Sequence, residues 1–134
     1  MNIAQAYEKF PTRDDCLACI EKVWWVGKPT CPYCRSKKFT SIRLQRKYHC
    51  NTCNCSYTVT VLTIFHKTHV DLQKWFVAID LLLNARVNRM PISSRQLAKE
   101  LEINRNTAWL MMKKIDRAMS HEQDRNLLLK LLEL

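Results

Sequence analysis

Hydrophobic positions along this chain of 134 residues fall into three successive patterns. Over residues 1–29 they recur at helical spacing, first ahead of Pro11 and again from Asp14 to about Val26. The carboxylates of Asp14 and Asp15 suit the N-terminal end of the second helix, where the helix dipole is positive. Gly27, the only glycine, begins a turn out of that helix. We therefore expect an N-terminal helical segment that ends near residue 29.

The second pattern covers residues 30–68. Phe39–Ile42, Lys47–Cys50 and Ser56–Val61 are rich in β-branched and aromatic residues, which suits short strands. A module this small buries too little apolar surface to be stable alone. A bound metal ion is therefore expected to replace part of the missing core.

The third pattern is helical again. Large apolar residues at steps of three and four predict a helix that ends before Met90-Pro91, namely Leu72, Trp75, Phe76, Ile79, Leu82 and Leu83. A short helix capped by Ser93 or Ser94 and a longer helix capped by Asn104 follow. This is the layout of a helix-turn-helix unit within residues 69–120. Its shared core is predicted to contain Leu97, Ala98, Leu101, Ile103, Ala108, Met111 and Ile115. Residues 121–134 are expected to be a leucine-rich tail without a core of its own.

Four cysteines form two C-x2-C pairs, Cys31/Cys34 and Cys50/Cys53, with 15 residues between the pairs. Two such turns can each point two thiolates at one ion, which supplies the four tetrahedral ligands of a structural Zn²⁺ site. Because all four ligands are thiolates, no coordination position stays open, and the single predicted zinc is structural. The expected fold is a small α+β protein, in which a zinc ribbon of short antiparallel strands precedes a helical helix-turn-helix domain.

Other cysteines leave alternatives open. Cys16 and Cys19 have the same spacing and could bind the ion together with Cys31/Cys34, which would leave Cys50/Cys53 unused, although their amphipathic helical surroundings favour buried thiols. A redox role for this pair is a weaker alternative, because no βαβ pattern surrounds it. Cys55 is expected to be a bystander thiol. His49, next to Cys50, is a possible replacement ligand for a set that is already complete.

The charge of the chain points to a polyanionic partner. The formal net charge is +10 and the pI is near 9.5. From Lys22 through Val70 there are nine Lys or Arg residues and no Asp or Glu. This balance favours duplex DNA. A membrane is disfavoured, because no apolar run approaches the roughly 18–20 residues that span a bilayer. Seven cysteines without an export signal predict a reducing compartment, so we expect a cytoplasmic protein.

The second helix of the helix-turn-helix unit carries the candidate DNA contacts. Arg105 and Asn106 fall in its first turn, where arginine can read guanine and asparagine can read adenine in the major groove. The predicted DNA-binding residues are Arg105, Asn106, Trp109, Lys113, Lys114 and Arg117 on this helix, with Arg43, Arg46 and Lys47 on the ribbon. A solvated face of a three-helix bundle is the alternative, but exposed Trp109 and Leu110 favour a partner.

The order of these elements resembles the N-terminal part of bacterial insertion-sequence transposases of the ISXO2-like group, which join a zinc ribbon and a helix-turn-helix to an Asp-Asp-Glu catalytic domain. The matching stretches are Cys31–Cys34, Tyr48–Cys53, Thr63–Thr68, Leu72–Phe76, Leu97–Leu101, Asn106–Trp109 and Lys114-Ile115. The resemblance covers about residues 10–120 and implies recognition of transposon ends. Such sequences usually have glycine where this chain has Arg35, Asn54 and Leu62. Because arginine adopts a left-handed turn less readily than asparagine, we expect a looser first knuckle.

In such transposases the first catalytic carboxylate would lie beyond Leu134. The acidic residues near the end of this chain fit a helix surface better than a two-metal site: Asp116, Glu122, Asp124 and Glu133. We therefore expect a DNA-binding module without catalytic residues, either truncated or acting with itself or a separately encoded catalytic half. A transcription regulator or transposition inhibitor is the main alternative. A redox enzyme and an adaptor that dimerises through the leucine-rich tail are weaker ones.

Overall fold

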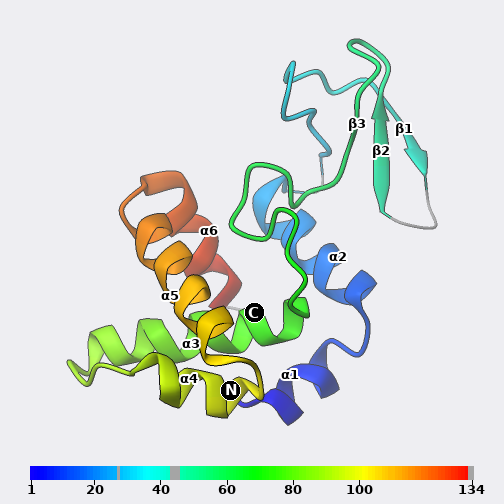
Figure 1. The fold of residues 1–134 in the computed structure, drawn as a ribbon. Coiled ribbons are helices and arrows are strands. Elements are labelled where there is room, and N and C mark those ends of the chain that lie inside the picture. Colours follow the sequence, from blue (N-terminus) through cyan, green and yellow to red (C-terminus); the bar gives the residue numbers. More distant parts are fainter. Residues whose placement is uncertain (27, 43–45, 133–134) are drawn as a thin grey trace.

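The computed structural model describes residues 1–26, 28–42 and 46–132 and places a small sheet at one end of a helical body (Figure 1). The elements are α1 (Ile3–Lys9), α2 (Arg13–Trp24), β1 (Phe39–Ile42), β2 (Lys47–Cys50), β3 (Ser56–Tyr57), α3 (Leu72–Val87), α4 (Ser94–Leu101), α5 (Arg105–Met119) and α6 (Glu122–Leu132). This arrangement confirms the predicted fold class, a small α+β protein with a helical part after the ribbon. The predicted turn at Gly27 lies outside the described residues.

Short polar residues determine where the helices begin. Thr12 caps α2 by accepting a hydrogen bond from the Asp15 backbone N–H, while the Asp15 carboxylate accepts one from the Thr12 N–H. Asp15 is thus part of a reciprocal capping box, a more specific role than the predicted interaction with the helix dipole. Ser93 caps α4 in the same way, and Asn104 caps α5 as predicted. Each cap satisfies a backbone donor that the first helical turn leaves unpaired.

The sheet has the strand order β1-β2-β3, and both pairings are antiparallel. Phe39 lies opposite Cys50, and Tyr48 lies opposite Tyr57. The third strand ends at Tyr57, so the predicted extension to Val61 is wrong. The chain turns there instead, and the Val61 N–H donates to the Thr58 carbonyl at 3.2 Å.

Helix α3 is the centre of the main core and contacts all the other helices. Trp75 and Ile79 are almost fully buried, and the Trp75 indole N–H donates to the Thr68 hydroxyl at 2.8 Å. No described helix combines the length and the apolar character that crossing a bilayer requires.

Helices α4 and α5 pack against each other and against α3. The predicted core is confirmed: Leu97, Ala98, Leu101, Ala108, Met111 and Ile115 are buried, and Ile103 is partly buried. The turn between the two helices uses Glu102 in a left-handed conformation, with φ 55° and ψ 46°. The Ile103 N–H then donates back to the Ala98 carbonyl at 3.0 Å, which closes the end of α4.

The leucine-rich segment is a helix in the core. Leu127, Leu128 and Leu131 of α6 are buried, and α6 packs against α2, α3 and α5. The expectation of a tail without a core is therefore wrong. The apolar face of α6 meets a helical surface built largely from earlier parts of the chain, which local periodicity does not reveal.

Candidate metal centre and nucleic-acid interface

Two matching backbone turns position the cysteines. The Arg35 N–H donates to the Cys31 carbonyl at 2.8 Å, and the Asn54 N–H donates to the Cys50 carbonyl at 2.9 Å. Both donor residues are left-handed, with φ 61° at Arg35 and 62° at Asn54. The two knuckles close alike, so the expectation of a looser first knuckle is wrong. Arg35 adopts the conformation that glycine usually supplies, at an energetic cost.

The four predicted ligand sulfurs converge on one point. They all lie within 4.8 Å of one another, with 3.7 Å between the sulfurs of Cys31 and Cys53 and 3.4 Å between those of Cys34 and Cys50. A tetrahedral ion with Zn–S bonds of about 2.3 Å requires sulfurs about 3.8 Å apart. The backbone N–H of Cys53 donates to the Cys50 sulfur at 3.5 Å. This contact helps to lower the pKa of Cys50 to about 6, whereas burial and the hydrogen bond to the Cys50 sulfur raise the pKa of Cys34 to about 12. Before an ion binds, the cluster therefore favours a thiolate at Cys50 and a thiol at Cys34.

The remaining cysteines lie outside this cluster. Cys16 is fully buried in the helical core, and burial raises its pKa to about 12. Burial also raises the pKa of Cys19. Both shifts disfavour a thiolate, so the described geometry supports the interpretation as buried thiols. Cys55 is exposed, and His49 is paired across the sheet with Thr40 and Ser56.

Aromatic side chains complete the small core around the sulfurs. The rings of Tyr48 and Tyr57 stack with centroids 5.8 Å apart. Trp25, just after α2, meets both tyrosines edge-on at 5.5 and 5.8 Å. The ribbon core is therefore separate from the main helical core but includes a side chain from the N-terminal segment.

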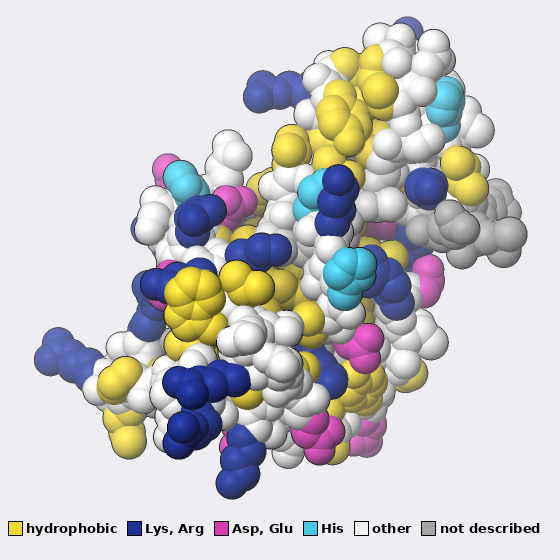
Figure 2. All heavy atoms as spheres, viewed as in Figure 1, with side chains coloured by type: hydrophobic (Ala, Val, Ile, Leu, Met, Phe, Trp, Pro, Cys, Tyr) yellow, Lys and Arg dark blue, Asp and Glu magenta, His cyan; other side chains and the backbone are white. Residues whose placement is uncertain are grey.

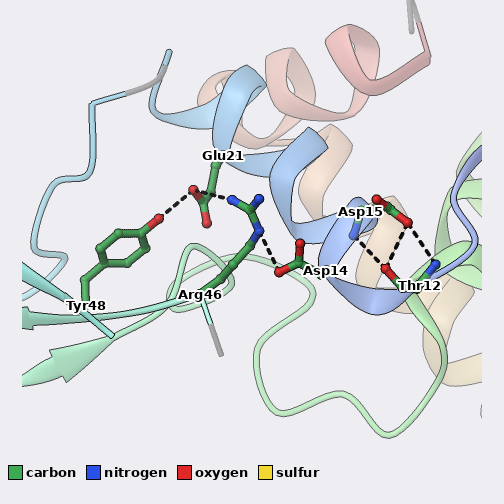
Figure 3. A network of polar contacts seen from close by, with 6 residues as sticks. All are labelled: Thr12, Asp14, Asp15, Glu21, Arg46 and Tyr48. Carbon is green, nitrogen blue, oxygen red and sulfur yellow. Dashed lines mark hydrogen bonds and ion pairs between the residues drawn. The ribbon is translucent and has the colours of Figure 1, made fainter. Parts of the chain in front are cut away.

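Polar contacts tie the same two regions together (Figure 3). Arg46, just before β2, donates to Asp14 at 2.8 Å and to Glu21 at 3.4 Å, and both carboxylates project from α2. The hydroxyl of Tyr48 donates to the same Glu21 oxygen at 2.7 Å. The other oxygen of Glu21 is buried without a hydrogen-bond partner among the described residues. We call this set the α2–ribbon latch: Asp14, Glu21, Arg46 and Tyr48.

The latch assigns Arg46 a role that sequence reasoning missed. Its guanidinium faces two carboxylates of α2, which leaves it poorly placed for the predicted DNA contact. The available signal was the spacing of Asp14 and Glu21, which lie two turns apart on one face of α2. Of the other ribbon candidates, Lys47 is half-buried in β2, and Arg43 lies outside the described residues.

The candidate residues of α5 are all on the molecular surface. Trp109 is 51 % exposed and Leu110 is 54 % exposed, although both belong to a helix whose other side is fully buried. The ammonium of Lys113 lies 5.2 Å from the centroid of the Trp109 ring. In the first turn, Arg105 and Asn106 are exposed. Lys114 and Arg117 are exposed further along the helix. All six predicted DNA-binding residues of α5 therefore lie on the exposed surface of that helix.

Comparison with known proteins identifies the ribbon. Residues 11–58 match the family model Zn_ribbon_IS1595, described as a transposase zinc-ribbon domain. The match begins just before α2, in agreement with the latch that joins α2 to the sheet. With this match and the convergence of Cys31, Cys34, Cys50 and Cys53, the site is that of one structural zinc ion.

The chain is also similar to an uncharacterized protein in transposable element ISH50 of Halobacterium salinarum. The two are 26% identical over 103 residues, which cover 75% of this chain and 33% of the relative. The chain therefore spans about a third of the length of that relative. No solved structure matches the chain. The matched ribbon segment is therefore similar to the zinc-ribbon domain of transposases.

Proposed function

We propose that this protein binds duplex DNA in a sequence-dependent way, as an insertion-sequence transposase recognises the ends of its element. In this proposal α5 enters the major groove, and the zinc ribbon lies beside it on the same duplex. The observation that carries the proposal is the exposed face of α5, a helix packed on α3 and α4 in the part of the chain that follows the matched transposase zinc ribbon.

The first turn of α5 supports the assignment of base contacts. Arg105 and Asn106 are exposed, and the backbone N–H of Asn106 is already bound by the side chain of Asn104 at 2.7 Å. The cap therefore holds this turn in place while the side chain of Asn106 stays available. Paired hydrogen bonds from arginine to guanine and from asparagine to adenine are the common means of reading these bases.

The middle of α5 supports contact with a large partner that offers both charged and apolar surface. Trp109 and Leu110 expose apolar surface that a solvated helix would not need. Lys113 lies over the Trp109 ring, so a cation and an aromatic face are presented together. DNA offers both phosphates and apolar base and sugar surfaces to such a pair.

The proposal assigns recognition and not strand cleavage to these residues. Among the described carboxylates near the end of the chain, Asp116 pairs with Arg86, and Glu122 and Asp124 lie in the first turn of α6. This arrangement suits helix surfaces and not a two-metal catalytic centre. Cleavage would then depend on carboxylates other than these, and purified protein with Mg²⁺ should leave labelled element ends uncut.

Binding measurements on the full chain test this function. Fluorescence anisotropy would compare an element-end duplex with a scrambled duplex of equal length, each at two salt concentrations. We expect tighter binding to the element end and a steep loss of affinity with salt. Asn106→Ala should reduce the preference, whereas Asn126→Ala, on the exposed side of α6, should not. Equal affinity for both duplexes would refute sequence recognition, and salt-independent or absent binding would refute DNA binding itself. Binding confined to promoter duplexes would favour a transcription regulator.

A further inference from the structure

A groove lies between the C-terminal half of α5, the start of α6 and the segment that leaves the ribbon. Its volume is 410 Å³. The polar side chains that line it are Thr63, His66, Lys114, Arg117, His121 and Asp124. In Figure 2, Lys, Arg and His side chains gather over the face formed by α5 and the segment after the ribbon. Two parts of the chain that are distant in sequence, the segment after the ribbon and the α5–α6 junction, thus build one hollow that holds two cations, with Leu62, Ile64 and Ala118 as its apolar lining.

The cations of this groove are available for a ligand. Lys114 and Arg117 lie one turn apart on α5, and within the described part of the chain neither forms an ion pair. Asp124 is the single carboxylate among the groove-lining residues. Two unpaired cations on one side of an open groove attract an anion and repel each other in its absence.

The wall opposite α5 is held firmly. The hydroxyl of Thr63 donates to the Thr60 carbonyl at 2.6 Å and accepts from the Phe65 N–H at 3.2 Å. The buried ring of Phe65 meets Trp75 of α3 edge-on at 5.7 Å. These contacts anchor the turn that presents the exposed His66 to the groove.

The position of the groove along α5 selects the anion. Lys114 and Arg117 lie eight and eleven residues after Asn106. At a rise of 1.5 Å per residue, these separations correspond to about 12 and 16 Å along the helix axis. The major groove of DNA is about 12 Å wide. When the first turn of α5 reaches base edges, Lys114 and Arg117 are far enough along the helix to meet the phosphates that border the major groove.

We propose that this groove binds one phosphodiester of the DNA backbone, which is contacted by Lys114 and Arg117 from α5 and by His66 and His121 from the rim of the groove. The inference rests on the proposed DNA-binding function and extends it. The segment that leaves the zinc ribbon becomes a direct DNA contact, and it shares its phosphate with the reading helix. Asp124 acts against the anion and limits the affinity of the groove.

A charge-matched comparison on the full-length protein tests this proposal. The groove variant carries Lys114→Gln and Arg117→Gln. The control variant carries Arg125→Gln and Lys130→Gln, two exposed cations of α6 that do not line the groove. Both variants lose two positive charges, so any difference between them reflects position. Circular dichroism and zinc content establish that each variant is folded.

We expect the groove variant to bind the element-end duplex about tenfold or more weakly. The slope of log affinity against log salt should become shallower by the amount that corresponds to about one phosphate contact. The control should change neither quantity appreciably. His66→Gln should weaken binding several-fold, and Asp124→Asn should strengthen it, a gain that misfolding does not produce. In ethylation interference, modification of one phosphate should block binding by the native protein. The same modification should weaken binding by the groove variant little further.

The outcomes separate this inference from the proposed function. If the native protein binds and Asn106→Ala abolishes its preference, while the groove and control variants behave alike, the groove inference fails and DNA recognition stands. If the native protein does not bind DNA, both fail. If only Lys114 and Arg117 contribute and His66→Gln has no effect, the shared contact from the ribbon side is wrong.

Discussion

Arg46 and Asp14 form an ion pair of 2.8 Å between residues that lie far apart in the sequence. The pair joins the turn before β2 to the first turn of α2, and Glu21 and Tyr48 extend it along the same helix face. The transposase zinc-ribbon match likewise includes α2. The predicted boundary near residue 30 therefore divides residues that the structure holds together.

Arg46→Gln should destabilise the native protein by about 1–2 kcal/mol, because Glu21 would keep its buried charge with only the Tyr48 hydroxyl as partner. Urea unfolding in the absence of DNA measures this effect. Lys37→Gln, a change in an exposed ribbon cation, serves as the control and should alter the unfolding free energy by less than about 0.5 kcal/mol. Equal stability of the two variants would contradict the latch.

Removal of zinc should disrupt the ribbon and leave much of the helical core folded. The sulfur-centred cluster and the helical cluster are separate, so loss of the ion removes the support of only the smaller one. Cys50→Ser should abolish stoichiometric zinc and the dispersed amide signals of β1 and β2 in NMR spectra, with most of the helical circular dichroism retained. Cys55→Ser, at an exposed cysteine outside the cluster, should retain both. A zinc-free protein with an intact sheet would contradict the metal's structural role.

Arg35→Gly should stabilise the protein by about 0.5–1 kcal/mol. The substitution removes the strain of a left-handed non-glycine residue from the folded state, and we expect this gain to exceed the cost of the greater conformational entropy of the unfolded chain. Leu62→Gly should act similarly, because Leu62 has φ 66°. Thermal unfolding of the zinc-loaded protein measures both changes. At Lys37, which is not among the positive-φ residues, the same change to glycine should not stabilise. A loss of stability in Arg35→Gly would show that the Arg35 side chain makes a compensating contribution.

Alkaline pH should destabilise the fold through its buried tyrosines. Burial, and next the hydrogen bond to Glu21, raise the pKa of Tyr48 to about 12 from an ordinary value of 10.0. The unfolded chain therefore loses this proton at a lower pH than the folded protein does. The stabilisation is fully present below pH 10 and is lost as the pH rises through 12.

Tyr48→Phe should accordingly flatten the dependence of the unfolding free energy on pH between 10 and 12, measured by urea unfolding. Tyr33→Phe, at a side chain that is 58% exposed, should leave the slope unchanged. A steep slope that persists unchanged in Tyr48→Phe would assign the alkaline transition to other groups.

The sequence by itself determined the features that depend on local spacing. The two C-x2-C pairs identified the zinc ligands, because a knuckle is closed by backbone contacts within a few residues. Helical periodicity located α3, α4 and α5 and the buried sides of α4 and α5, because residues three and four apart share a helix face. The DNA contacts of α5 stay predictions, since they depend on a partner.

Only the tertiary structure decided which distant residues meet. It turned Arg46 toward α2, buried the leucines of α6, ended β3 at Tyr57 and brought His66 to the same groove as Lys114. Each outcome depends on contacts between parts of the chain that fold together from different elements. Periodicity records which face of an element is apolar, but it does not record what that face will pack against. That choice is made by the shape and charge of the assembled core.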